Sequence, residues 1–510
     1  MLNITIKKTL LYSLLTFFLL IPLIVWADDS WDKSIIRELP SVLEMHRKFV
    51  SIRNVASVHE DMYRNVEFVK PKFEKLGFNV QLLKSSTLPV FFAEKIVDEE
   101  ARTILFYLHL DGQAVNPANW DQENPFVPML KKQDDKGSWI TIDWQDINKK
   151  IDLDWRMFGR ASADDKDPIT MMLSALKLLQ DAGTAPAYNV KIILDLQEEA
   201  GSQDFLSTLE KYKKYYAADY MIIMDGPAHS SNKPTITFGC RGIAWFSMTV
   251  YGAKLPQHSG HYGNYAPNPV FAMSHLLASM KNEQGRVTIE GYYDDIEIDR
   301  EIRTVLENVP DNEIEIRRGL GIKKADDVGN SYQEALQYPS LNVRHIETSW
   351  KGPGVKTIIP ESISAHIDVR LVAETDGARQ IEKIRRHIEE QGYLVLDREP
   401  TDTERLLRSK IVRFDGHSGI NAFRTDMNTP IGQHLISQLT SAYGERPVTI
   451  RTMGGTVPIV PAINTLKIPA VIVPMVNIDN NQHNPNENLR IGNLIQGIKM
   501  SMVILSMQMD

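Results

Sequence analysis

The chain contains, at residues 104–111, the stretch Ile104-Leu105-Phe106-Tyr107-Leu108-His109-Leu110-Asp111, an apolar run that ends in a histidine and an aspartate. Three later runs have the same form: residues 190–196 precede Glu198-Glu199, residues 220–224 precede Asp225, and residues 469–473 precede His483. Between the first two runs, residues 169–179 carry apolar side chains at helical spacing. Apolar runs that alternate with helices predict an α/β fold, with a mostly parallel sheet flanked by helices on both faces.

The start of that helix has its own sequence signal. Asp167 is expected to cap the helix, and Pro168 to occupy its first turn. Just before it stands Asp164-Asp165, in a segment where a tight turn would hold a carboxylate rigidly.

The polar residues after these runs predict a metal site. Ligands of a parallel sheet bind outside the carboxyl ends of its strands, and each of the four runs delivers an acidic residue or a histidine there. The chain has a single cysteine, Cys240. An intrachain disulfide and a cysteine-based zinc or iron–sulfur site are therefore excluded, and any metal must be held by His, Asp and Glu.

A pair of divalent ions accounts for the number of candidates. Two ions about 3.5–4 Å apart require one shared carboxylate, further ligands for each ion, and a non-ligand carboxylate that takes a proton from water. His109 and Asp111 share one face of a strand end, so Asp111 is expected to bond the far nitrogen of His109. Glu198 and Glu199 cannot point the same way, which suits one ligand and one base.

Each of these motifs has a plainer interpretation when it is taken alone. A His-x-Asp pair is more often a surface hydrogen bond, and two adjacent glutamates usually lie on a solvated helix face. Asp225, before Gly226-Pro227, equally suits a turn. The order of the motifs and their placement at predicted strand ends favour the metal site.

From residue 240 to residue 400 the pattern changes. Residues 365–371 alternate apolar and polar side chains, as in a half-exposed antiparallel strand, and helical patterns lie near 268–281 and 375–391. We therefore predict a smaller α+β domain over residues 240–400. It is inserted into a catalytic domain whose two parts are residues 28–239 and 401–510. The polar segment 112–158 is expected to be a loop close to the site.

The N-terminus has the features of a secretory signal peptide, predicted over residues 1–27. Lys7 and Lys8 precede an apolar run, which ends in Val25-Trp26-Ala27. The alternative is an uncleaved membrane anchor, since a run of about 17 residues is at the lower edge of membrane-spanning length. Cleavage predicts a periplasmic or secreted protein, and an uncleaved segment predicts a membrane-anchored one. Both alternatives place the body of the protein outside the cytoplasm, without a further membrane span.

Charge and motif content exclude other classes of protein. The chain carries 57 Lys and Arg against 65 Asp and Glu, a net charge of −8. No nucleic-acid partner is expected, since such binders carry a basic surplus. Neither Gly-x-Ser-x-Gly nor Gly-x-Gly-x-x-Gly occurs, so the serine-hydrolase and dinucleotide-enzyme classes are excluded as well.

From about residue 40 to the C-terminus, the chain resembles the di-zinc hydrolase family of aminoacylases, glutamate carboxypeptidases and carnosine-type dipeptidases. The resemblance rests on ten motifs in the family's order: His109-x-Asp111, Ser162-x-Asp164-Asp165-Lys166, Glu198-Glu199, Met224-Asp225-Gly226, Arg241-Gly242, His258-Ser259-Gly260, Lys356-Thr357-Ile358-Ile359-Pro360, Arg370-Leu371-Val372, Gly454-Gly455-Thr456-Val457-Pro458 and His483-x-Pro485-Asn486-Glu487. The segment Tyr338-Pro339-Ser340 points to the dipeptidase branch. One departure is Asp167, where the family usually has glycine, which is expected to add a negative charge near the metals.

The resemblance implies a role for each residue of the predicted centre. Asp164 would bridge two zinc ions in each subunit, with His109 and Asp225 completing one site and Glu199 and His483 the other. Co²⁺ or Mn²⁺ could replace zinc.

Further implied roles concern the reaction and the substrate. Glu198 would be the general base, and Asp111 would support His109. The smaller domain, ferredoxin-like in this family, would act as a lid and as the dimerisation surface of a homodimer, and His258 would reach the neighbouring subunit's site. Arg370 would hold a substrate carboxylate near the turn of Gly455 and Thr456.

The predicted function is zinc-dependent hydrolysis of an amide or peptide bond in a short peptide with a free carboxylate, of the dipeptidase or carboxypeptidase type. Two alternatives stay open. One is an N-acyl amino acid deacylase, whose substrate would be an acyl amino acid. The other is a non-catalytic peptide-binding protein on the same fold.

Overall fold

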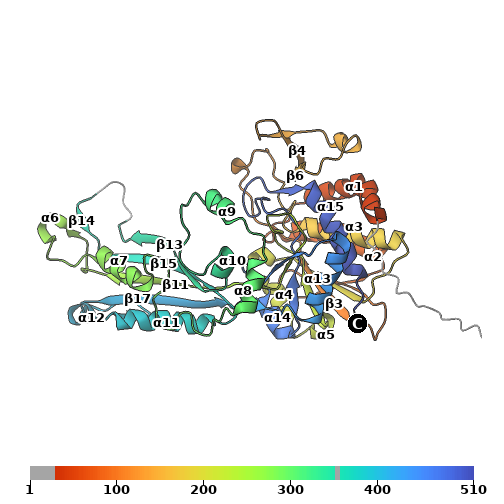
Figure 1. Cartoon of the computed structure of the whole chain (residues 1–510). Helices are drawn as coiled ribbons and strands as arrows, with labels where there is room; N and C mark the ends of the chain where they lie inside the picture. The colour runs from red at the N-terminus through yellow and green to blue at the C-terminus, as the bar shows by residue number, and fades with distance from the viewer. Residues whose placement is uncertain (1–28, 351–355, 510) are drawn as a thin grey trace, which may run out of the picture.

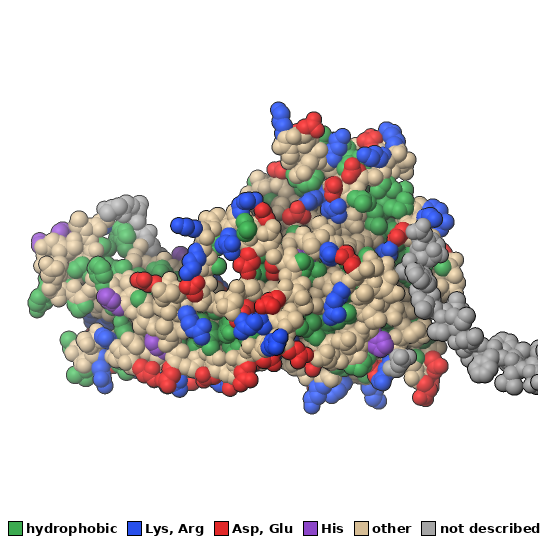
Figure 2. All heavy atoms as spheres, in the orientation of Figure 1, with side chains coloured by type: hydrophobic (Ala, Val, Ile, Leu, Met, Phe, Trp, Pro, Cys, Tyr) green, Lys and Arg blue, Asp and Glu red, His purple; other side chains and the backbone are tan. Residues whose placement is uncertain are grey.

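The computed structural model describes residues 29–350 and 356–509, and the predicted signal peptide of residues 1–27 lies outside them. Figure 1 shows two lobes, a larger one on the right and an elongated one on the left. Within the described ranges, no helix combines the length and the apolar character needed to cross a membrane. On the face in Figure 2, acidic and basic side chains are interspersed.

The larger lobe is built on an eight-stranded sheet. The strands lie in the order β1 (Asn79–Leu83), β2 (Val90–Lys95), β7 (Asn189–Asp195), β3 (Thr103–His109), β8 (Tyr220–Ile223), β20 (Ala470–Ile472), β9 (Thr235–Thr237) and β19 (Val448–Ile450). Neighbours along β7-β3-β8-β20 run parallel. These four strands are the four apolar runs of the sequence, so the predicted α/β fold is confirmed.

The central strands are mainly apolar because both of their faces are covered. Ile104 and Phe106 of β3 belong to one hydrophobic core, and Leu105 and Tyr107 belong to another on the opposite face. One face carries α1 (Asp29–Val50), α2 (His59–Lys75), α3 (Lys166–Asp181), α13 (Pro430–Tyr443) and α15 (Ile491–Ser506), and the other α4 (Gln203–Thr208), α5 (Lys213–Tyr216) and α14 (Val460–Leu466). Full burial of a side chain such as Phe106 contributes roughly 1.5–3 kcal/mol to the stability of the fold.

The start of α3 differs from the prediction. The helix begins at Lys166 with Asp165 at the cap position, so the prediction that Asp167 caps it was wrong. Asp167 is fully buried, and neither of its carboxyl oxygens has a hydrogen-bond partner. Burial raises the pKa of Asp167 well above its usual value. Burial therefore favours the neutral form of this side chain, which opposes the expected negative charge. Pro168 lies in the first turn, as predicted.

The smaller lobe, called the lid lobe below, has a mainly antiparallel sheet. Its order is β13 (Ser340–Thr348), β15 (Ser362–Leu371), β11 (Gly242–Tyr251), β17 (Ile411–Ile420) and β16 (Leu394–Leu396). Alternate residues of β15 are buried, because α7 (Pro269–Met280) and α11 (Gly377–Glu390) pack against this sheet. The α+β organisation was predicted. The predicted domain boundaries stay predictions. The strand β17 belongs to this sheet, although it follows residue 400, the predicted end of the smaller domain.

The segment 112–158 is more ordered than the predicted loop. Three of its strands join β21 (Asn488–Arg490) in a second sheet of the larger lobe, in the order β21, β6 (Arg156–Phe158), β4 (Met129–Gln133) and β5 (Trp139–Thr141). Because β21 follows the loop of His483 and β6 precedes the turn of Asp164, this pairing brings the two loops together.

The remaining elements are short. They are α6 (Ser259–Tyr262), α8 (Arg300–Glu307), α9 (Glu313–Leu320), α10 (Tyr332–Ala335), α12 (Asp402–Leu407), β10 (Gly239–Cys240), β12 (Gln257–His258), β14 (Ile358–Ile359), β18 (Phe423–Arg424) and the 3₁₀ turns η1 (Pro117–Asn119), η2 (Trp144–Asn148) and η3 (Glu198–Ala200).

Candidate metal centre

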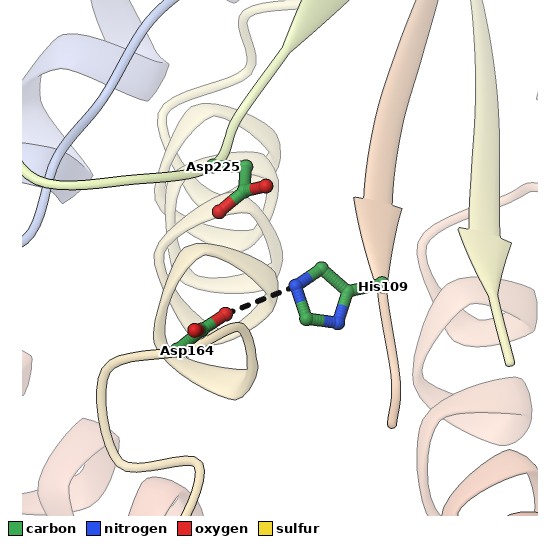
Figure 3. Close-up of side chains that lie close together, drawn as sticks. All are labelled: His109, Asp164 and Asp225. Carbon is green, nitrogen blue, oxygen red and sulfur yellow. Dashed lines mark ion pairs between the residues drawn. The ribbon is translucent and has the colours of Figure 1, made fainter. Parts of the chain in front are cut away.

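The first ligand group lies at the carboxyl ends of the central strands. His109 is the last residue of β3, Asp225 follows β8, and Asp164 lies in the turn before α3. One donor atom from each of the three lies within 4.8 Å of the others. Figure 3 shows the three side chains pointing toward one another, with Nε2 of His109 3.0 Å from Oδ1 of Asp164. This arrangement can hold one metal ion.

The second group shares Asp164 with the first. Its donor atoms come from Asp164, Glu199 and His483 and again lie within 4.8 Å of one another. Nε2 of His483 lies 3.1 Å from Oδ2 of Asp164 and 3.2 Å from Oε2 of Glu199. Because the two oxygens of Asp164 face different histidines, this carboxylate is placed to serve two ions.

The pKa values of the ligands at the centre depend on two opposing effects, burial on one side and hydrogen bonds with neighbouring charges on the other. Burial by itself raises the pKa of Asp164, but hydrogen bonds from His109 and His483 outweigh it and hold that pKa below its usual value. Burial lowers the pKa of His109, but the charge of Asp165 and hydrogen bonds to Asp111 and Asp164 raise it well above the usual value. The protonation state of each ligand therefore depends on the charges of its neighbours.

The other carboxylates are crowded and favour protonation. Burial and the charge of Asp164 raise the pKa of Glu199 to about 7. Burial raises the pKa of Asp225 to about 6, although the charge of His109 opposes this. Burial also raises the pKa of Glu198 well above its usual value. Divalent cations relieve such crowding, and imidazole nitrogens with carboxylate oxygens are donors that zinc accepts. The residues present therefore fit a pair of metal ions.

Asp111 holds the turn that carries both glutamates. The backbone N–H of Glu198 donates to its Oδ1 (2.9 Å), and the backbone N–H of Glu199 donates to its Oδ2 (3.1 Å). Nδ1 of His109 lies 3.1 Å from the carbonyl oxygen of Asp111 and 3.4 Å from Oδ1. Asp111 thus lies beside His109 as expected, but its carboxylate mainly serves the glutamate turn, a role that spacing alone did not indicate.

Two supporting residues were not singled out from the sequence. Nε2 of Gln113 donates to Oε2 of Glu199 (2.7 Å). The carboxylate of Glu487 accepts the backbone N–H of Asp164 (3.0 Å). Gln113 follows the His109-x-Asp111 motif by two residues, and Glu487 ends the motif that begins at His483. The sequence signal that could have identified them was their position beside or within these motifs.

The residues predicted to bind the substrate, and His258, which was predicted to act in catalysis, belong to neither ligand group. Nη1 of Arg370 donates to Oγ1 of Thr456 (2.8 Å), with Gly455 next to it. His258 is exposed, its Nδ1 accepts the backbone N–H of Gly260 (3.0 Å), and it directly precedes α6, at the far end of the lid lobe in Figure 1. Within one chain the structure therefore separates His258 from the ligand groups.

Comparison with known proteins agrees with this geometry. Residues 105–506 match the model of peptidase family M20/M25/M40. The chain is 25% identical over 472 residues to Beta-Ala-His dipeptidase of Mus musculus, covering 88% of each chain. It is 25% identical over 420 residues to the Cys-Gly metallodipeptidase dug1 of Schizosaccharomyces pombe, covering 81% of each.

A solved structure has the same fold. It is an M20 family metallo-carboxypeptidase from Sulfolobus solfataricus, with a TM-score of 0.72 and 26% identity. The match covers 92% of this chain and 99% of that one.

Proposed function

The chain belongs to peptidase family M20/M25/M40 and is a metallopeptidase, and we propose that it is a di-zinc enzyme that hydrolyses dipeptides. One observation carries the proposal: Asp164 contributes to both ligand groups, so a single carboxylate can bridge two ions. His109 and Asp225 would complete one zinc site, and Glu199 and His483 the other. Co²⁺ or Mn²⁺ could occupy the same donors.

The residues divide the chemistry between them. When bound, the two ions supply Lewis-acid chemistry, polarising the scissile carbonyl and lowering the pKa of the attacking water. Glu198 lies outside both ligand groups. Burial raises its pKa, and the charge of His109 opposes this shift. Glu198 takes a proton from water as the water oxygen bonds to the carbonyl carbon. It returns that proton to the amine nitrogen as the C–N bond breaks.

A free carboxylate on the substrate suits Arg370, whose guanidinium bonds to Thr456. Arg370 would pair with that carboxylate, and Thr456 orients the guanidinium through the hydrogen bond from Nη1. The names of two relatives, Beta-Ala-His dipeptidase and Cys-Gly metallodipeptidase, favour a dipeptide as the substrate. The metallo-carboxypeptidase structure supports a carboxypeptidase as the second candidate.

The position of His258 supports a homodimer. A histidine at the tip of the lid lobe could act in catalysis if a second copy of the chain brought it to a metal centre, where it would stabilise the tetrahedral oxyanion. We further propose that the enzyme works in the periplasm or outside the cell, on the strength of the signal-peptide features of residues 1–27.

The test uses the purified protein from residue 28 to the C-terminus, that is, without the predicted signal peptide. The protein is stripped with a chelator, reloaded with zinc, cobalt or manganese, and assayed on dipeptides, longer peptides and N-acyl amino acids. We expect about two ions per chain and metal-dependent release of amino acids, fastest from dipeptides. Preferred cleavage of acyl amino acids would instead identify a deacylase. Peptide binding without hydrolysis by the fully loaded protein would identify a binding protein.

A further inference from the structure

Glu487 links the two loops that carry the metal ligands. It lies four residues after His483, immediately before β21, and is fully buried. Its Oε1 accepts the backbone N–H groups of Ala163 and Asp164, both at 3.0 Å, and its Oε2 accepts that of Ala161 at 3.1 Å. One carboxylate thus holds the turn that delivers Asp164.

A positively charged side chain in the same turn, Arg160, balances the negative charge of Glu487. Nη1 of Arg160 donates to Oε2 of Glu487 at 2.6 Å, and Arg160 is also buried. Nη2 of Arg160 donates to the carbonyl oxygen of Asn484, which is adjacent to His483 (3.3 Å). A buried carboxylate needs such a partner, because removing charge from water is costly. The pair therefore ties the Asp164 turn to the His483 loop a second time.

The backbone of the turn is shaped for this carboxylate. Ala161 has φ +63°, the left-handed region that side chains other than glycine adopt less readily. That conformation aims successive N–H groups at a common point, as in other anion-binding turns. The backbone N–H of Gly159 also donates to the carbonyl oxygen of Glu487 (3.0 Å). The arrangement specifically fits a carboxylate at position 487.

We propose that Glu487 is a positioning residue of the metal centre, which sets the location of the bridging Asp164 relative to His483. The inference deepens the proposed function and rests on it, since it assumes that these two residues bind metal. Glu487 belongs to neither ligand group. It acts through the backbone of Asp164 on one side and the chain that leads from His483 on the other.

The test variant is Glu487→Gln, which keeps the size of the side chain but removes its charge and one acceptor oxygen. The matched control is Asp479→Asn, on the same stretch of chain. Within the described residues, the carboxylate of Asp479 accepts hydrogen bonds from Arg156 of β6 (2.7 Å) and from Asn477 (2.9 Å), and none from the Asp164 turn. The readouts are zinc affinity by chelator competition, zinc content after dialysis, the visible spectrum of the cobalt form, and the circular dichroism spectrum.

We expect Glu487→Gln to keep the native circular dichroism spectrum and to bind zinc about 10–100-fold more weakly, the usual effect of losing a residue that supports metal ligands. The visible spectrum of its cobalt form should change, and excess zinc should restore part of its kcat. Asp479→Asn should match the wild type in all of these. A purely structural role would lower the melting temperature but leave the zinc affinity of the folded protein intact, which would overturn the proposal.

A second variant covers the case in which Glu487→Gln does not fold. Glu487→Asp keeps the charge that pairs with Arg160 but is one methylene shorter, so it cannot make the ion pair and reach the N–H of Asp164 together. Weaker zinc binding in this folded variant supports the proposal, and wild-type affinity contradicts it. A wild-type protein that binds no metal would instead refute the proposed function.

Discussion

Oδ2 of Asp164 lies 3.1 Å from Nε2 of His483. The other oxygen, Oδ1, lies 3.0 Å from Nε2 of His109. A side chain that faces two histidines in this way links parts of the chain that are far apart in sequence. The centre therefore depends on the two loops that carry Asp164 and His483, as well as on the strand that ends in His109.

Replacing Glu198 by glutamine tests its role as the base. Without the carboxylate, no group is placed to take the proton of water, and kcat should fall by about 10²–10⁴-fold. Zinc content should stay at the wild-type value, since Glu198 belongs to neither ligand group. Stopped assays and elemental analysis measure the two quantities. Glu210→Gln, at an exposed position, is the control, and near-normal turnover of Glu198→Gln would show that another residue is the base.

Replacing Asp111 by asparagine tests the glutamate turn. In the amide, an NH2 group replaces one of the two oxygens that accept the N–H groups of Glu198 and Glu199, so one of these two hydrogen bonds is lost. The turn should loosen, and zinc affinity or activity should fall about 10–100-fold. Chelator competition and steady-state kinetics measure this. Unchanged values for both would mean that Asp111 does not hold the turn.

The pH dependence of stability reports on His46, which connects α1 to α3. Its Nε2 lies 2.9 Å from the carbonyl oxygen of Ser162, and burial lowers the pKa of His46 to about 4. In the unfolded chain a histidine titrates near pH 6.5. Between these values the unfolded state binds more protons, so the free energy of unfolding should rise with pH, by about 3 kcal/mol across the window.

The measurement is urea unfolding of the wild type and of His46→Gln at several pH values from 4 to 7.5. Protonation of the metal ligands affects both proteins, so the difference between them isolates His46. The stability difference should grow as pH rises from 4 and level off above 6.5. Parallel curves for the two proteins would contradict the buried neutral state of His46.

The strands of the centre were predictable from the sequence for a physical reason. Parallel strands covered on both faces are mainly apolar and do not alternate with polar residues, so β3, β7, β8 and β20 appear as nearly continuous runs. The residues that follow such runs meet at one edge of the sheet. His109, Glu199 and Asp225 could therefore be assigned to one place from the pattern of apolar runs alone.

Other features depend on contacts that local patterns do not contain. The strands β4 to β6 are only three to five residues long, and their sheet is completed by β21 from near the C-terminus. The role of Asp111 depends on a turn 87 residues away along the chain. Asp167 obeys the local rule for a helix cap, but tertiary packing buries it instead.

The most direct test of the shared carboxylate is the zinc content of Asp164→Ala beside that of His483→Ala, each measured on folded protein after dialysis at a fixed free zinc concentration. If Asp164 bridges two ions, its loss should weaken both sites and leave close to no zinc. Loss of His483 should remove only the ion of its own group and leave about one. Equal retention of one ion by the two variants would contradict the shared role of Asp164.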